Sequence, residues 1–250
     1  MIDMREIYVD KLFQEALTEF NHKELDGDCT GVSECKWKVF KKAFLEFTNS
    51  KCPICEKLID EYSHIDHYRP KDKTLYPFLE CCYQNYMLMC PVCNSTYKKT
   101  DFPLYGQNRI RAKNKSELTN EKPLIANPLH DDIYELFELQ FINTTKGKSI
   151  LILNPRKDLD EYKKAKAEKT IEFYGIGNCD NNEKMSSCRI DLLEEHYERL
   201  LDFARLSKKC LTQKTEENKK ILAGYVKDKP NIKKYGFYKF IVKNQFKIAV

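Results

Sequence analysis

The sequence has little of what marks a fibrous chain, a low-complexity chain or a membrane protein. Its 250 residues include 8 glycines, 9 prolines and one tryptophan, and so few glycines and prolines exclude a fibrous or loop-dominated protein. No stretch approaches the roughly 18 consecutive apolar residues that a membrane helix needs. Residues 1–6 are charged and lead into no apolar run, so we expect no signal peptide. Without either feature, we expect a soluble, cytoplasmic chain, and its hydrophobic content of 42% predicts a substantial core.

A strong charge of one sign is also missing from the chain as a whole. The net charge is +5, which on its own is too small to indicate a nucleic-acid partner. Positive charge is concentrated in two segments: residues 51–115 contain 11 basic and 7 acidic residues, and residues 219–250 contain 9 and 1. The second segment interleaves aromatic residues with its lysines. It fits either an additional nucleic-acid surface or a packed amphipathic helix with a solvated lysine face.

Cysteine, by contrast, is abundant. Eleven cysteines cannot all pair within one chain, and the thiols of a cytosolic protein stay reduced, so we expect metal ligands or core residues instead of disulfides. Seven of the cysteines follow no ligand spacing: Cys29, Cys35, Cys81, Cys82, Cys179, Cys188 and Cys210.

The other four cysteines form two Cys-x-x-Cys pairs, Cys52 with Cys55 and Cys90 with Cys93, and both pairs begin with Cys-Pro. Four thiolates arranged in this way can surround one Zn²⁺ tetrahedrally. We therefore predict a structural zinc site, because a closed Cys₄ site leaves no coordination position for a substrate. The alternative is two unrelated turns in the core.

Candidate catalytic residues lie between and after the cysteine pairs. Asp66 and His67 are adjacent, and Pro70 predicts that their strand ends close by. At a strand end, the carboxylate can hold a hard cation while the imidazole takes a proton from water. Asn94, at the start of a helix expected over residues 91–100, offers a neutral oxygen for the same cation. This ligand set suits Mg²⁺ or Mn²⁺.

His64 lies two residues before Asp66 and therefore on the same face of the expected strand. Its role stays open between a structural histidine and a contact with the metal or the substrate.

The pattern Cys52-x-x-Cys55, Asp66-His67, Asn85 and Cys90-x-x-Cys93-Asn94-x-x-x-Lys98 resembles the zinc-bearing branch of the HNH nucleases. The likeness covers roughly residues 50–104, and Asn94 stands at a position that is often histidine. The resemblance implies a ββα-metal core that hydrolyses phosphodiester bonds of nucleic acid.

The resemblance also implies a role for each residue. His67 would be the general base that activates water, and Asp66 and Asn94 would hold one catalytic Mg²⁺ or Mn²⁺. Asn85 would brace the loop that holds His67. Three basic residues would neutralise phosphates: Arg69, Lys71 and Lys98.

A closer resemblance extends beyond this core. Residues 66–71, 85–86, 102–104 and 124–128 are similar to the HNH subunit of Septu-type anti-phage systems and of their retron-associated relatives. Residues 169–176 fit the end of a helix in that family, although Gly177-Asn178-Cys179 follows where Asn-Arg is usual. The resemblance implies an effector subunit of a defence complex and a partner ATPase of the ABC/SMC type.

The expected fold is an α+β chain without flexible linkers. It comprises N-terminal helices over residues 1–50, an HNH core with a Cys₄ zinc over 51–110, and a mainly helical region with one hairpin over 111–250. Further elements are expected as follows: a short hairpin within 57–70, strands at 135–142 and 149–153, and helices at 158–174 and 189–210.

Two other functions fit parts of the pattern. A non-catalytic, zinc-organised nucleic-acid-binding module would need the four cysteines and the basic tail, but it leaves Asp66, His67 and Asn94 unexplained as a set. A stand-alone restriction or homing-type nuclease would keep the catalytic residues and lack the ATPase partner. Residues that read bases cannot be identified in the sequence, so it does not distinguish DNA from RNA.

Overall fold

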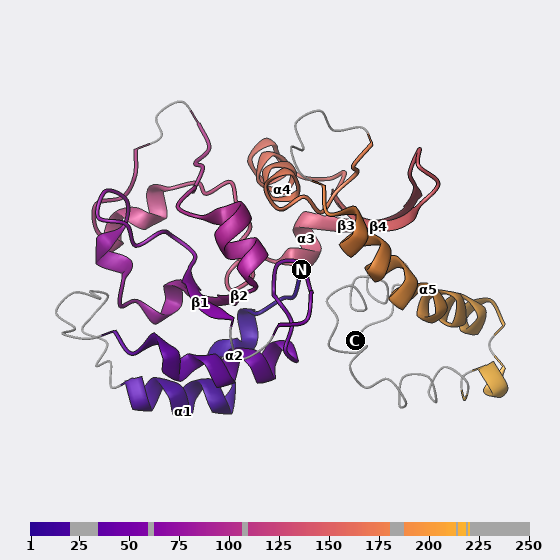
Figure 1. Cartoon of the computed structure of the whole chain (residues 1–250), viewed down its shortest axis with the longest axis horizontal. Coiled ribbons are helices and arrows are strands. Elements are labelled where there is room, and N and C mark those ends of the chain that lie inside the picture. The colour runs from indigo at the N-terminus through magenta and orange to yellow at the C-terminus, as the bar shows by residue number, and fades with distance from the viewer. Residues whose placement is uncertain are drawn as a thin grey trace.

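The computed structural model is a mixed α+β chain (Figure 1), as the sequence predicts. It describes residues 1–20, 35–59, 63–106, 110–180, 188–213, 215–218 and 220, and it leaves out several side chains after Glu198. The helices are α1 (Lys11–Phe20), α2 (Lys41–Thr48), α3 (Ile133–Leu136), α4 (Glu161–Tyr174) and α5 (Ile190–Thr212). The strands are β1 (His64–His67), β2 (Tyr86–Met89), β3 (Phe137–Asn143) and β4 (Ser149–Pro155). A short helix with π-helical winding, η5, covers Val92–Lys98.

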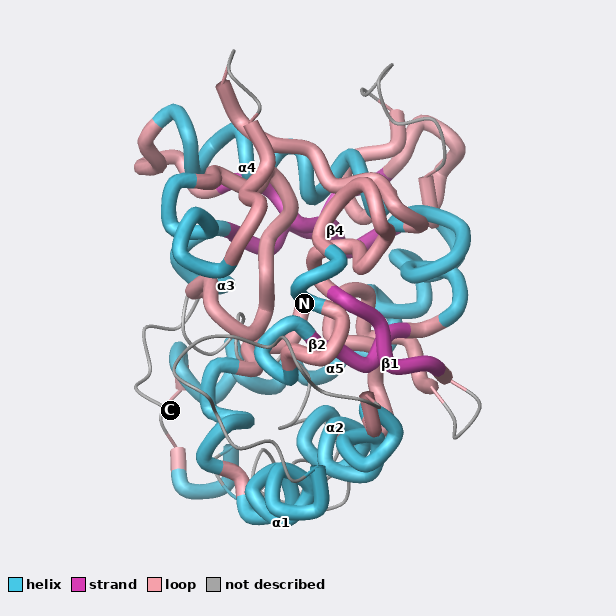
Figure 2. The backbone as a smooth tube through the Cα atoms, turned by 90° about the vertical axis from the view of Figure 1, so that its left-hand side faces the viewer, coloured by secondary structure: helices cyan, strands magenta, loops and turns pink. Residues whose placement is uncertain are grey.

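The N-terminal helices form a layer under the first sheet. α1 packs against α2, and α2 packs against β2, on the side of the sheet that Figures 1 and 2 show below it. Phe13 of α1 contacts Phe40 and Phe44, with ring centroids 5.0 and 5.8 Å apart. All three rings are fully or almost fully buried, so these helices contribute aromatic side chains to the core.

The first sheet joins two distant segments. β1 runs antiparallel to β2, with His64 opposite Met89 and His67 opposite Tyr86. The local hairpin predicted within 57–70 is therefore wrong. β2 has the sequence Tyr-Met-Leu-Met and is buried along its whole length, and pairing with this apolar run removes more surface from water than a local polar partner would.

The second sheet is the predicted hairpin. β3 pairs with β4 across residues 144–148, and Gly147 adopts a φ of +76° in the turn. α4 follows, with Asp160 accepting a hydrogen bond from the backbone of Lys163 at its start and Gly175 ending it at a φ of +62°. These are the cap residues that the helix geometry favours, and the predicted boundaries are correct to within three residues.

One hydrophobic core connects these parts. α4 contacts both β4 and η5, and α5 packs against β4. The first residues of the chain run between the two sheets (Figure 2), and the α-amino group of Met1 lies 2.8 Å from a carboxylate oxygen of Glu56, with both groups buried. Among the described helices, none combines the length and the apolar character that crossing a bilayer requires.

Candidate functional site

The four predicted zinc ligands lie together in the interior. The sulfur atoms of Cys52, Cys55, Cys90 and Cys93 are all within 4.8 Å of one another, and all four residues are buried. The sulfurs of Cys55 and Cys90 are 3.7 Å apart, close to the edge of about 3.8 Å that a tetrahedron with Zn–S bonds of about 2.3 Å has. The donor set and its spacing fit a metal ion such as zinc.

A tight backbone turn within each Cys-x-x-Cys pair positions its two sulfur atoms. In the first pair, the backbone N–H of Glu56 donates to the carbonyl of Cys52 over 2.8 Å, and Glu56 adopts a φ of +58°. In the second pair, the N–H of Cys93 donates to the sulfur of Cys90 over 3.3 Å. Each turn directs both of its thiols to the same side.

Helix α5 contributes two side chains to this cluster that the sequence analysis missed. Arg189, at the start of α5, donates from Nη1 to the sulfur of Cys93 over 3.2 Å and from Nη2 to the sulfur of Cys55 over 3.3 Å. His196 Nε2 donates to the carbonyl of Cys55 over 2.7 Å. The hydrogen bond from Cys52 and the positive charge of Arg189 contribute to lowering the pKa of Cys55 to about 6, which favours the thiolate form that binds metal.

Two of the predicted catalytic residues, Asp66 and His67, lie at a separate cavity of about 490 Å³. Asp66 and His67, at the end of β1, line it together with His64 from the start of the same strand. Lys98, the last residue of η5, lines the cavity as well. His64 is exposed there, so it is a cavity side chain and not a buried structural histidine.

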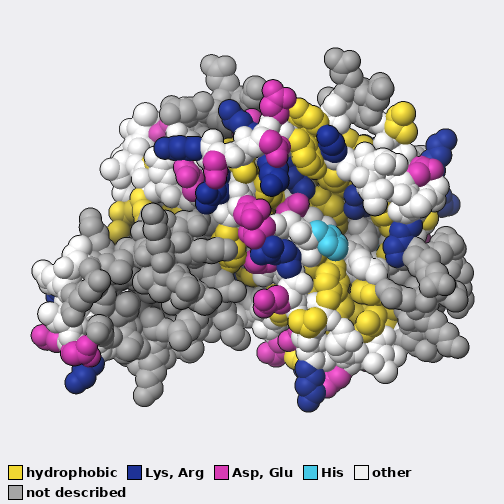
Figure 3. All heavy atoms as spheres, turned by 180° about the vertical axis from the view of Figure 1, so that it is seen from behind, with side chains coloured by type: hydrophobic (Ala, Val, Ile, Leu, Met, Phe, Trp, Pro, Cys, Tyr) yellow, Lys and Arg dark blue, Asp and Glu magenta, His cyan; other side chains and the backbone are white. Residues whose placement is uncertain are grey.

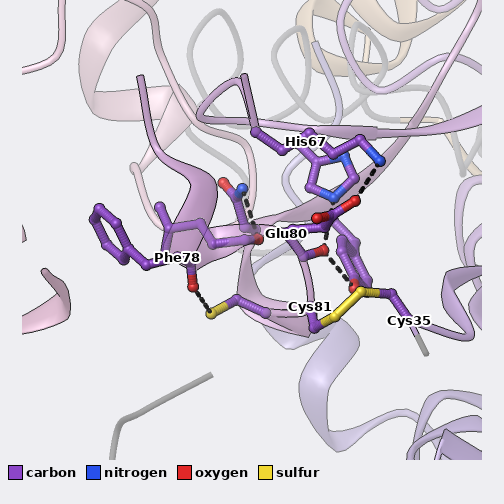
Figure 4. Close-up of a disulfide and its surroundings, with 10 residues drawn as sticks. Cys35, His67, Phe78, Glu80 and Cys81 are labelled. Atoms are coloured by element: carbon purple, nitrogen blue, oxygen red, sulfur yellow. Dashed lines mark hydrogen bonds and ion pairs between the residues drawn. A yellow bond between two sulfur atoms is a disulfide. The ribbon is translucent and has the colours of Figure 1, made fainter. Parts of the chain in front are cut away.

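His67 is held in a defined orientation. Its Nε2 lies 2.8 Å from the carbonyl oxygen of Glu80 (Figure 4), and Tyr86 donates its hydroxyl to the same oxygen. A carbonyl only accepts, so Nε2 carries the proton and Nδ1 of the neutral ring is an acceptor. Burial lowers the pKa of His67 below its ordinary value of 6.5, which keeps the imidazole neutral at neutral pH.

Asp66 carries a buried negative charge. Its Oδ2 lies 2.7 Å from the ammonium of Lys98, and the two side chains are 14% and 4% exposed. The same oxygen receives no hydrogen bond of good geometry, so Lys98 compensates it as a charge and not as a directed donor. A carboxylate oxygen in this state is a suitable ligand for a cation.

Asn85 holds the chain that follows His67. Its Oδ1 accepts from the backbone N–H of Arg69 over 2.8 Å, and its Nδ2 donates to the carbonyl of Arg69 over 2.9 Å. The backbone of Tyr68 is fixed as well, because its N–H donates to the carbonyl of Asn85 over 2.7 Å. Asn85 thus makes the loop contacts expected of a bracing residue.

The remaining predicted residues are placed less uniformly. Lys71 lines the cavity, where its ammonium lies 2.8 Å from Glu80 and 4.4 Å from the centre of the Trp37 ring. Arg69 instead forms an internal ion pair with Glu121 at 3.0 Å and lies over aromatic rings, with its side chain 15% exposed. Its charge is used inside the protein and not in the cavity. Asn94 is half-buried on η5 and does not line the cavity.

Two pairs of the other cysteines are disulfide-bonded, which corrects the expectation of reduced thiols. The structure joins Cys35 to Cys81 and Cys179 to Cys188. The first disulfide lies beside Glu80 and His67 (Figure 4). The fold can bring together cysteines that are far apart in the sequence. Their spacing in the sequence does not indicate which of them will pair.

Surface charge is mixed around these features. On the face seen in Figure 3, basic and acidic side chains of the described residues are interspersed. The basic tail, residues 219–250, is predicted to be a nucleic-acid surface or an amphipathic helix, and the structure describes only Lys220 of it.

Comparison with curated proteins finds two relatives with the same name. A protein of Bacillus mycoides (strain KBAB4) named Septu protein PtuB is 29% identical over 169 residues, which is 62% of this chain and 50% of the relative. A protein of the same name from Bacillus thuringiensis is 40% identical over 57 residues, 22% of this chain and 21% of the relative. The predicted resemblance to the Septu systems is confirmed.

The match to these relatives covers only part of their length. The chain spans half the length of the first relative and about a fifth of the second. No family model and no solved structure matches the chain. The likeness therefore rests on sequence similarity to the two Septu proteins.

Proposed function

We propose that this chain is a metal-dependent HNH endonuclease and the effector subunit of an anti-phage defence complex. The observation that carries the proposal is the convergence of Asp66, His67 and Lys98 on one cavity at the end of β1 and η5. A binding module needs no oriented imidazole beside a buried carboxylate. The cavity combines the two with a basic side chain, which is what hydrolysis of a phosphodiester requires.

The chain path supports an HNH core. Two antiparallel strands, β1 and β2, are followed directly by the helix η5, which is the element order of a ββα-metal fold. The four-cysteine cluster lies at the junction of β2 and η5, because Cys90 follows Met89 and Cys93 stands on η5 itself. A zinc ion there would fix the helix relative to the strands.

His67 acts as the general base in this proposal. The carbonyl of Glu80 holds the Nε2 proton, so Nδ1 is the nitrogen that accepts a proton from the attacking water. The lowered pKa keeps this nitrogen unprotonated at neutral pH. General-base catalysis of this kind contributes about 10²- to 10⁴-fold to a rate.

Asp66 and Asn94 are the proposed ligands of a catalytic Mg²⁺ or Mn²⁺. A bound cation would stabilise the negative charge that develops on the phosphate and on the leaving oxygen. The buried Oδ2 of Asp66, compensated only by the charge of Lys98, fits this role. Asn94 stands four residues before Lys98 on η5 and could supply the second oxygen.

Lys98 and Lys71 are the proposed phosphate contacts. A cation at Asp66 competes with the Lys98 ammonium for the same oxygen, so cation binding would release Lys98 toward the substrate. Lys71 is 40% exposed, and its ion pair with Glu80 is weak enough for a phosphate to replace it. Arg69 contributes indirectly, through the loop that Asn85 and Glu121 hold.

The biological role follows from the relatives. Both are Septu proteins, and the motif resemblance implies an ATPase of the ABC/SMC type as the partner that controls the nuclease. We propose such a partner for this chain, with DNA or RNA as substrate. A stand-alone nuclease would instead cleave fully without it.

The test is cleavage of plasmid DNA and of total RNA by the purified chain in Mg²⁺, Mn²⁺ or EDTA, with and without the ATPase encoded beside it. We expect cleavage with either divalent ion and none in EDTA. The variant Asp66→Ala should lose cleavage while it keeps one zinc per chain. Binding of nucleic acid without cleavage under every condition would favour the non-catalytic module.

A further inference from the structure

Trp37 is a residue of the cavity that the motif does not contain. It opens the short 3₁₀ segment Trp37–Phe40, and it lies on the rim of the cavity that Asp66 and His67 line. Its ring is 6.0 Å from the imidazole of His67, centre to centre, with the ring planes at 76°. The indole therefore stands directly beside the proposed general base and remains half-exposed.

The ring also meets a basic side chain. The ammonium of Lys71 lies 4.4 Å from the centre of the Trp37 ring and 2.8 Å from Glu80. An aromatic face next to a mobile cation is the combination that proteins use to bind single-stranded nucleic acid, because a base stacks on the ring while a cation meets its phosphate. If Lys71 turns to a phosphate, it uncovers the ring face that it occupies here.

We propose that Trp37 stacks on a nucleobase next to the scissile phosphate, so that the preferred substrate is single-stranded or unpaired at the cleavage point. This inference rests on the proposed nuclease function, since it places the scissile phosphate between Asp66 and His67. A base attached to that phosphate would lie close enough to stack on the Trp37 ring, which is next to His67.

The preference for a single strand follows because a duplex covers the faces of its bases. Inside a double helix, both faces of each base are covered by neighbouring base pairs, so a protein ring stacks only on a base that has left the stack. The cavity of about 490 Å³ has the size of a site for one small ligand. A site of this volume suits a single nucleotide that has left the stack.

The single tryptophan of the chain makes the contact directly measurable. In the full chain with Asp66→Asn, which removes the proposed cation ligand, tryptophan emission is followed while a single-stranded oligonucleotide or its duplex is added. We expect saturable quenching by the single strand and none by the duplex. Equal responses to the two, or no response to either, would overturn the inference.

Substitution separates stacking from packing. With a fluorescently labelled single strand, Trp37→Ala should weaken binding about tenfold, the lower part of the range for loss of one stacked base. Trp37→Phe should restore most of the affinity, and Tyr105→Ala, whose ring packs against Tyr162, should leave it unchanged. Unchanged binding by Trp37→Ala would overturn the inference.

The two proposals fail in different ways. If the wild-type chain cleaves nucleic acid with Mg²⁺ but Trp37→Ala keeps the same affinity and preference for single strands, the stacking is wrong and the nuclease stands. If no metal-dependent cleavage occurs while the single strand still quenches Trp37, the nuclease is wrong and the stacking stands as a binding contact.

Discussion

At the scale of single residues, Lys98 is the most informative side chain of the cavity. The motif predicts it as a phosphate contact, and the structure places its ammonium 2.7 Å from Asp66, with the side chain 4% exposed. A lysine in this position neutralises the carboxylate. A cation that binds the carboxylate, or a phosphate that binds the ammonium, would replace one partner of the ion pair. In the proposed nuclease, this ion pair would therefore link metal binding to substrate binding.

This account predicts the behaviour of Lys98→Met. Removing the ammonium leaves a buried carboxylate unpaired, which should lower the free energy of unfolding by about 3–5 kcal/mol. Millimolar Mn²⁺ should restore much of that loss, and it should stabilise Lys98→Met more than the wild type in thermal unfolding. The exposed neighbour Lys99→Met is the control. An equal Mn²⁺ effect in all three proteins would contradict the shared site.

Asn85 gives a second prediction at this scale. Replacing it with Ala leaves the half-buried N–H and C=O of Arg69 without their partners, which should cost about 1 kcal/mol. Denaturant unfolding measures this change. Cleavage should fall as well, because the chain after His67 loses its brace; full activity in a destabilised Asn85→Ala would show that the brace does not position the base.

At the scale of elements, the four-cysteine cluster fastens η5, the first sheet and α5 to one another. Arg189 donates to two of its sulfurs from the start of α5. Partners that hydrogen-bond to metal ligands tune the affinity for the metal. At this cluster, the start of α5 thus contacts the segments that carry the two cysteine pairs.

The consequence is a measurable effect of Arg189→Ala on zinc. The variant should bind zinc about 10- to 100-fold more weakly than the wild type. The measurement is the rate at which zinc moves from the protein to a coloured chelator, which should be faster for the variant. Arg156→Ala, which breaks a surface ion pair with Asp158, is the matched control. Equal transfer rates for the two variants would remove Arg189 from the metal site.

Loss of a ligand should have a larger effect. Cys52→Ser should lose zinc and the cooperative unfolding transition together, since binding of a structural zinc contributes directly to folding. Cys81→Ser, which breaks the disulfide with Cys35 but removes no cluster ligand, should keep one zinc per chain in its folded state. A folded and active Cys52→Ser without zinc would contradict the structural role of the cluster.

Local features of these elements could be read from the sequence. The turn around Gly147 and the caps Asp160 and Gly175 follow from residue types that act within a few positions, and the two Cys-x-x-Cys pairs specify their own turns. Contacts between distant segments could not be read in this way. β1 pairs with a strand some 20 residues on, and Arg189 reaches Cys93 and Cys55 across 96 and 134 positions.

At the scale of the whole molecule, the disulfide between Cys35 and Cys81 joins the N-terminal part of the chain to the segment beside the Asp66–His67 cavity. Cys35 precedes Trp37 by two residues, and Cys81 follows Glu80, whose carbonyl holds His67. Trp37 and His67 thus belong to segments that one covalent bond connects. Neither cysteine belongs to a motif, so only the folded chain reveals this connection.

Breaking this bond should destabilise the fold. The bond links residues 46 positions apart, for which the loss of loop entropy in the unfolded chain corresponds to about 4 kcal/mol. Cys35→Ser should unfold at a correspondingly lower denaturant concentration, and a reducing agent should shift the wild type toward it. The same stability with and without reductant would contradict a structural bond.

The central claim is that His67 activates water in a metal-dependent nuclease, and the most direct measurement compares two histidine variants. His67→Ala should lose at least 10²-fold in cleavage rate with Mg²⁺, with unchanged zinc content and circular dichroism. His130→Ala, whose exposed ring stacks on Tyr8 away from the cavity, should cleave at the wild-type rate. Wild-type cleavage by His67→Ala would contradict the account.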